Sequence, residues 1–73
     1  MVDELRPSRT GTIISFAGHS GRGYIRPLDG GGDISFDLAV CNGPAPRNGG
    51  LCRFDAQPAG GGTMIARSVT VLR

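Results

Sequence analysis

Residues 20–37 read SGRGYIRPLDGGGDISFD, and this stretch decides the fold. Two short segments with β-branched and aromatic residues lie on either side of the glycine-rich sequence LDGGGD. Glycine adopts the positive φ angles that hairpin turns need, so the stretch predicts two antiparallel strands joined by a tight turn. In the second strand apolar and polar residues alternate, which is typical of a strand with one buried and one solvent-facing side. The apolar positions are Ile34, Phe36 and Leu38, and the polar positions are Asp33, Ser35 and Asp37.

The same pattern recurs along the rest of the chain. Five short segments with β-branched and aromatic residues are bounded by Gly, Pro and Asp, which indicates an all-β barrel or sandwich. They are residues 12–17, 23–28, 33–40, 51–56 and 64–72, and none has the apolar period of an amphipathic helix. Residues 41–50 predict a longer loop, and residues 58–63 predict a flexible turn. A hairpin, a third strand, a long loop and a second hairpin together predict a five-stranded antiparallel barrel of the OB type.

The length of the chain, 73 residues, allows one small domain. A core of this size supplies only about 3–5 kcal/mol of net stability. Residues 1–9 carry charges and a proline without an apolar period, so we interpret them as a flexible tail and residues 10–73 as the folded domain. The sequence has no apolar run of membrane-spanning length and no secretory signal, so we expect a cytoplasmic protein that does not bind membranes.

All eight basic residues are arginines, and the formal net charge is +2. A weak positive charge permits an anionic partner without requiring one, and arginine grips phosphate or stacks on a base. Genome composition explains the same arginine usage equally well. The sequence places Arg26, Arg47, Arg53 and Arg67 either along a phosphate path or as scattered surface charges, and both interpretations remain open.

Neither a metal site nor an active site is predicted. Cys41 and Cys52 are the only cysteines, they lack C-x-x-C spacing, and His19 is the only histidine, so we expect no metal and no cofactor. Cys52 alternates with Arg53 and Asp55 and shares its face with Phe54 and Ala56, which predicts a small buried hydrophobe. His19 and Ser20 are adjacent without an orienting acid, so no catalytic constellation is present and we expect no enzyme.

Three stretches resemble the cold-shock domain. They are GTIISFA (residues 11–17), SGRGYIRP (20–27) and DGGGDISFDL (29–38), and the family runs approximately G-x-V-K-W-F-N, K-G-F-G-F-I-x-P and D-G-G-x-D-V-F-V-H-F. The second half follows more loosely, with Phe54 at a family phenylalanine and ARSV (66–69) at A-x-N-V. The resemblance covers about residues 10–73. It implies a five-stranded OB barrel that binds single-stranded RNA or DNA on aromatic side chains of its first three strands.

The match implies a binding face with fewer aromatic side chains than the family has. Ser15 stands at the family tryptophan, Ser35 at a phenylalanine, Asp37 at the histidine, Leu38 at the last phenylalanine and Ile14 at a lysine. Phe16 is retained, Tyr24 replaces a phenylalanine, and Arg22 replaces another with a guanidinium plane that stacks on bases. Asp37 opposes phosphate. The candidate nucleic-acid-binding residues are Phe16, His19, Arg22, Tyr24, Arg26 and Ser35.

Several of these residues have structural explanations as well. Tyr24 is also explained by cross-strand packing, Phe16 by a position half in the core, and His19 by an ordinary polar loop. Gly21 and Gly23 are better explained by strand bends and close strand approach than by ligand contact. Two functions therefore remain: a protein that holds an unpaired nucleic-acid strand open, passively or as a chaperone, with weakened or altered preference, and a protein-interaction module whose barrel contacts an acidic partner.

Overall fold

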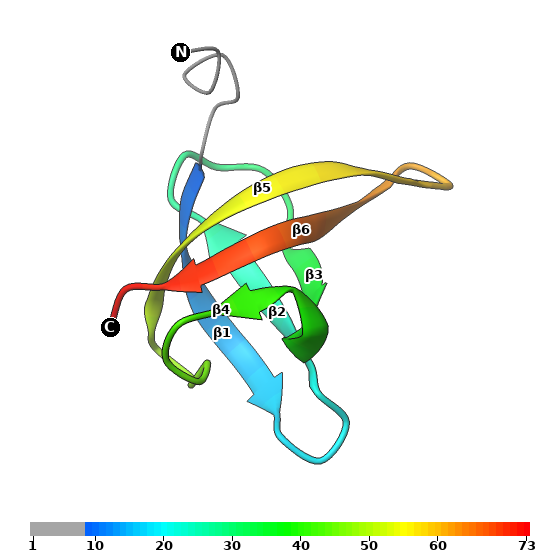
Figure 1. Cartoon of the computed structure of the whole chain (residues 1–73). Coiled ribbons are helices and arrows are strands. Elements are labelled where there is room, and N and C mark those ends of the chain that lie inside the picture. Colours follow the sequence, from blue (N-terminus) through cyan, green and yellow to red (C-terminus); the bar gives the residue numbers. More distant parts are fainter. Residues whose placement is uncertain (1–8) are drawn as a thin grey trace, which may run out of the picture.

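The computed structural model describes residues 9–73, so residues 1–8 of the predicted tail lie outside the described part. Its elements are β1 (Arg9–Ala17), β2 (Arg22–Pro27), β3 (Ile34–Asp37), the 3-10 helix η2 (Leu38–Val40), β4 (Cys41–Asn42), β5 (Leu51–Gly60) and β6 (Thr63–Val71) (Figure 1). The five predicted segments correspond to β1, β2, β3, β5 and β6. Arg9, assigned to the tail from the sequence, is the first residue of β1.

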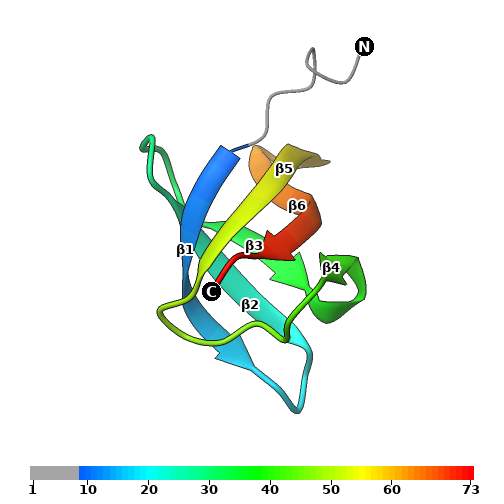
Figure 2. The ribbon, with the colours of Figure 1, turned by 60° about the vertical axis from the view of Figure 1, so that its left-hand side comes forward.

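The strands close into a barrel in the order β1-β2-β3-β6-β5, and β4 extends the sheet beside β6. The prediction of a purely antiparallel barrel is wrong, because β3 and β4 both pair with β6 in parallel. The direction of each strand explains this. Since β5 is antiparallel to β1 and β6 is antiparallel to β5, β6 runs the same way as β1 and β3. Closure between β3 and β6 must therefore be parallel. Figure 2 shows β5 between β1 and β6 on the opposite side of this closure.

The glycine turn between β2 and β3 forms as predicted. Gly30 and Gly31 have φ angles of 97° and 93°, which residues with a Cβ rarely adopt. They reverse the chain between Pro27 and Ile34, so that β2 and β3 pair antiparallel. Figure 1 shows this turn at the end of the barrel where β1 begins.

The core lies inside the barrel and contains apolar side chains from β1, β2, β3, β5 and β6. Its buried members are Ile13, Ile25, Ile34, Phe36, Cys52, Phe54, Ala66, Val69 and Val71. The predicted burial of Phe36, Phe54 and Cys52 is confirmed, whereas Ala56 is only half-buried. Among residues 9–73 no polar or charged side chain is buried, so the core gains its stability from apolar packing.

The predicted burial of Leu38 is wrong, because 46% of this residue is exposed. Strand β3 ends at Asp37, and the Asp37 carboxylate accepts a hydrogen bond from the Ala39 amide at 3.3 Å. This contact caps η2 and turns the chain before the alternation reaches Leu38. The turn also brings the chain to Cys41–Asn42, which form β4 at the start of the predicted loop.

Candidate functional site

A row of four side chains crosses the outer surface of the barrel. Ser15 of β1 is level with Tyr24 of β2, Tyr24 with Ser35 of β3, and Ser35 with Ile65 of β6. Residues directly opposite each other on neighbouring strands project from the same face, so these four share one surface. Tyr24 is 51% exposed, whereas Ser35 and Ile65 are half-buried. Tyr24 is therefore the prominent aromatic residue of this face.

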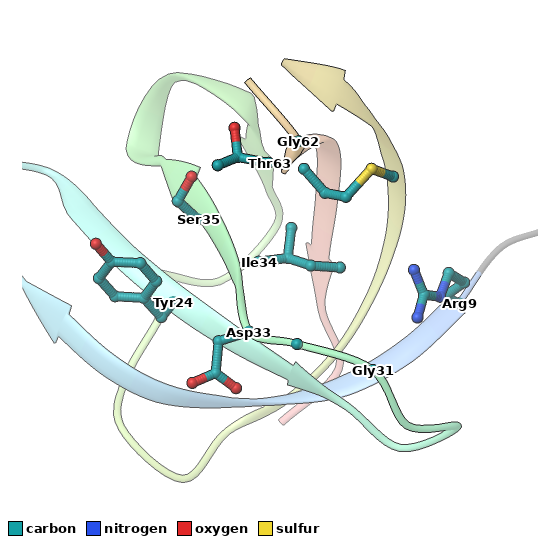
Figure 3. A pocket seen from close by; sticks show the side chains of 10 residues that line it. Arg9, Tyr24, Gly31, Asp33, Ile34, Ser35, Gly62 and Thr63 are labelled. Atoms are coloured by element: carbon teal, nitrogen blue, oxygen red, sulfur yellow. The ribbon is translucent and has the colours of Figure 1, made fainter. Parts of the chain in front are cut away.

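Two depressions lie on either side of the Tyr24–Ser35 pair. The larger, about 600 Å³, is bordered by Arg9, Tyr24, the 31–33 turn, Ile34, Ser35 and the hairpin residues Gly62, Thr63 and Met64 (Figure 3). The smaller, about 260 Å³, is bordered by Arg22, Gly23, Tyr24, Ser35, Phe36, Asp37 and Ile65. Because Tyr24 and Ser35 belong to both, we treat the two depressions as one site and call it the groove.

The structure places Phe16 away from the groove. The β1–β2 register shifts between Ile13 and Ser15, so Ile14 is an extra residue in β1. Beyond the shift Phe16 is level with Gly23, on the inner side of the sheet. Its ring stacks on Phe36 with centroids 5.9 Å apart and an interplanar angle of 10°. Phe16 is half-buried and packs against the core, as one of its two interpretations predicted.

Gly23 makes this aromatic stack possible. It lies between Phe16 of β1 and Phe36 of β3 in the cross-strand register. A Cβ at Gly23 would lie 2.7 Å from two atoms of the Phe36 ring and would also collide with the Ser15 carbonyl oxygen. Close strand approach, the structural interpretation of this glycine, is therefore confirmed.

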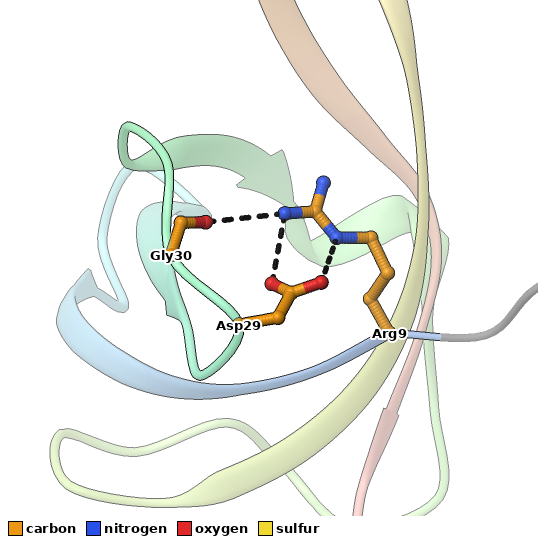
Figure 4. A network of polar contacts seen from close by, with 3 residues as sticks. All are labelled: Arg9, Asp29 and Gly30. Atoms are coloured by element: carbon orange, nitrogen blue, oxygen red, sulfur yellow. Dashed lines mark hydrogen bonds and ion pairs between the residues drawn. The ribbon is translucent and has the colours of Figure 1, made fainter.

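Most arginines beside the groove have an aspartate next to them. The Arg9 guanidinium donates to both Asp29 carboxylate oxygens, at 3.0 and 3.3 Å, and to the Gly30 carbonyl oxygen at 3.4 Å (Figure 4). It also lies 5.5 Å from the centre of the Phe54 ring. The hydrogen bond from Arg9 lowers the pKa of Asp29 below its ordinary value. Arg9 thus fixes the turn that borders the larger depression.

The other two arginines beside the groove also have an aspartate near them, in an ion pair for Arg26 but only at the same level of the register for Arg22. Arg26 forms an ion pair with Asp33 at 3.3 Å, and Arg22 is level with Asp37 in the β2–β3 register. The face around the groove therefore carries little net positive charge, and it attracts phosphate weakly. Arg9 was missed from the sequence because nothing in residues 1–9 shows that the chain begins its first strand there.

The remaining predicted residues are placed as follows. Arg22, Tyr24 and Ser35 border the groove together, and Arg26 contacts it through Asp33. His19 is exposed in the turn after β1, where the Ser20 and Gly21 amides donate to the Ala17 carbonyl oxygen, and it borders neither depression. Asp37 borders the smaller depression and caps η2, so it has a structural contact that the sequence did not reveal.

Both cysteines are free thiols. Burial raises the pKa of Cys52 to about 11, and burial also raises the pKa of Cys41. In residues 9–73 no three side chains of His, Cys, Asp and Glu lie close enough together to hold a metal ion. The same part of the chain contains no helix with the length and apolar character needed to cross a membrane.

No protein-family model matches the chain, and no curated protein sequence matches it. The function is therefore inferred from the barrel, the groove and the charges beside it.

Proposed function

We propose that this chain is a cold-shock-like protein with an OB-type barrel and that its groove binds single-stranded RNA or DNA. The observation that carries the proposal is the position of Tyr24, half exposed between two depressions on the outside of a closed barrel. A base that stacks on such an aromatic ring gains about 1–3 kcal/mol. The motif resemblance over residues 11–38 supports the same assignment.

The roles of the side chains follow from their places in the groove. Tyr24 stacks on one base. The bases before and after it in the nucleic-acid strand enter the depressions on the two sides of Tyr24. Arg22 borders the smaller depression, where its guanidinium plane stacks on a base or contacts a phosphate. The Ser35 hydroxyl contacts sugar or phosphate. Phe16 acts from beneath, because its stack with Phe36 supports the strands that carry Tyr24 and Ser35. Binding keeps the strand unpaired and requires no chemical step.

Base stacking rather than phosphate attraction supplies most of the affinity. Arg9 and Arg26 are engaged by Asp29 and Asp33, which leaves Arg22 as the principal cation of the groove. For single strands the slope of log K against log salt is about −0.7 per neutralised phosphate. We therefore expect a shallow slope of about −0.7 to −1.4, which corresponds to one or two neutralised phosphates.

An NMR titration with a short oligothymidylate tests the proposal. Amide shifts are expected at Arg22, Tyr24 and Ser35, and Tyr24→Ala should weaken binding roughly 5- to 150-fold, the equivalent of one base stack. Leu28→Ala is the control, because Leu28 is exposed and borders neither depression. If no resonance moves at low salt and high oligonucleotide excess, the groove does not bind nucleic acid.

The second candidate is a protein-interaction module. The pairing of Arg9 with Asp29 and of Arg26 with Asp33 favours it, because a peptide needs fewer cations than a nucleic-acid strand. An acidic partner would then rely chiefly on Arg22. The oligothymidylate titration separates the two candidates, since a protein-interaction module predicts no shifts around Tyr24.

A further inference from the structure

Strand β6 forms a side of both depressions. Thr63 and Met64 border the larger one, and Ile65 borders the smaller. Among the described residues of β1, by contrast, Arg9 alone borders either depression. The groove therefore lies over β2, β3 and β6, across the parallel junction that closes the barrel.

Ile65 belongs to the same cross-strand row as Tyr24. It is level with Ser35, and Ser35 is level with Tyr24. Neighbouring strands lie about 4.8 Å apart, so Tyr24 and Ile65 are about 10 Å apart and contact different bases. Ile65 is half-buried and borders the smaller depression, and Met64 is 38% exposed and borders the larger one, so each depression has an apolar side chain on its β6 side.

Arg67 follows Ile65 by two residues along β6. The β5–β6 register is irregular there, because Ala56 is level with Ala66 and Asp55 with Ser68, which leaves Arg67 without a partner residue on β5. Extending the parallel register of Ser35 with Ile65 by two residues puts Arg67 level with Asp37, which borders the smaller depression. Arg67 is exposed, and neither ion pair recorded within residues 9–73 involves it.

We propose that the bound nucleic-acid strand crosses the β3–β6 junction, so that one base stacks on Tyr24, the next packs against Ile65, and Arg67 contacts the phosphate beyond. This inference rests on the proposed function, and it adds β6 as a binding surface. Arg67 differs from Arg9 and Arg26 in that neither ion pair recorded within residues 9–73 involves it, and Asp37, which the register puts level with it, accepts a hydrogen bond from the Ala39 amide. The bound nucleic-acid strand therefore runs toward β6 rather than toward β1, because Ser15 of β1 has no ring on which a base could stack.

Fluorescence anisotropy with a labelled short oligothymidylate, measured over a range of salt concentrations, tests the path. Arg67→Gln should weaken binding several-fold and reduce the salt slope by about 0.7, the share of one phosphate. Ile65→Ala should weaken binding about tenfold with an unchanged slope, as expected for a lost base contact. Arg53→Gln is the matched control, because Arg53 is exposed on β5 and is level with Thr10 and Thr70, away from β3.

The outcomes distinguish this inference from the proposed function. If the wild-type chain does not bind, both fail. If it binds and Tyr24→Ala weakens binding, while Arg67→Gln and Ile65→Ala behave like Arg53→Gln, the strand does not cross to β6. If Ile65→Ala does not fold, the test uses the Ile65 methyl resonances of the wild-type chain instead. These resonances must shift on titration with the oligothymidylate if the path is right.

Discussion

Replacing Gly23 with alanine should come close to unfolding the protein. The new Cβ would lie 2.7 Å from the Cε1 and Cζ atoms of Phe36, well inside ordinary contact. Either the strands separate or the Phe36 ring leaves its stack with Phe16. Overpacking costs about 1–3 kcal/mol, and a lost aromatic pair costs about 0.5–1.5 kcal/mol. The total, about 1.5–4.5 kcal/mol, approaches the roughly 3–5 kcal/mol available to a domain of this size.

Thermal denaturation followed by circular dichroism measures this cost. For a domain of this length a loss of about 1.5–4.5 kcal/mol lowers Tm by roughly 6–36 °C. Gly32→Ala is the matched control, because a Cβ at Gly32 meets no atom within 4 Å and the backbone there does not have a positive φ. This variant should be more stable than the wild-type chain by about 0.4–1 kcal/mol. Gly21→Ala isolates backbone strain, since its φ is 73° and a left-handed alanine costs about 1–2 kcal/mol. If Gly23→Ala melts close to Gly32→Ala, the close approach at Gly23 does not hold the barrel together.

Three further perturbations give defined outcomes. Burial raises the pKa of Cys52 from 9.0 to about 11, so urea titrations should show stability that is maintained below pH 9 and falls as the pH rises toward 11. Cys52→Ala should reduce this dependence and leave the part that comes from the raised pKa of Cys41. Arg9 lowers the pKa of Asp29 below its ordinary value of 3.8, so their ion pair stabilises the fold above pH 3.8 and is lost as the pH falls further. Acidification should therefore lower the Tm of the wild-type chain more than the Tm of Asp29→Asn. Asp37→Ala should cost about 0.5–2 kcal/mol through the lost cap, while Asp37→Asn should retain most of the stability in the same melting experiment.

The strands were predictable because their signals are local. The alternation of Ile34, Ser35 and Phe36 and the glycines of the 29–33 turn depend only on residues next to each other in the chain. Parallel closure was not predictable in this way. It follows from the directions of all five barrel strands, and its only paired residues, Ser35 and Ile65, are 30 positions apart.

The end of β3 shows the limit of a pattern that is otherwise reliable. The apolar–polar alternation of the sequence predicted that Leu38 is buried, because a leucine at that position continues the series of Ile34 and Phe36. The structure instead uses the Asp37 side chain as a cap, and short polar side chains compete with strand pairing in this way. Asp37 was interpreted only as a charge that opposes phosphate. Asp37→Ala removes both the charge and the cap, so a gain in affinity has to be measured against a loss of stability, whereas Asp37→Asn removes the charge and keeps a capping oxygen.

The composition of the binding face depends on one extra residue in β1. Without the register shift at Ile14, the parity of the strand would place Phe16 on the outer surface and Ser15 on the inner one. With the shift, Phe16 faces Phe36 and Ser15 stands beside Tyr24, so β1 supplies a stack for the core and no ring for a ligand. A bulge of this kind has no signature in the motif GTIISFA, because the residue spacing is the same with or without it. On this side of the barrel Arg22 and Tyr24 of β2 are exposed, and on β6 Ile65 is half-buried and Arg67 is exposed. On the path proposed above, a ligand that stacks on Tyr24 therefore makes its next contacts across the β3–β6 junction.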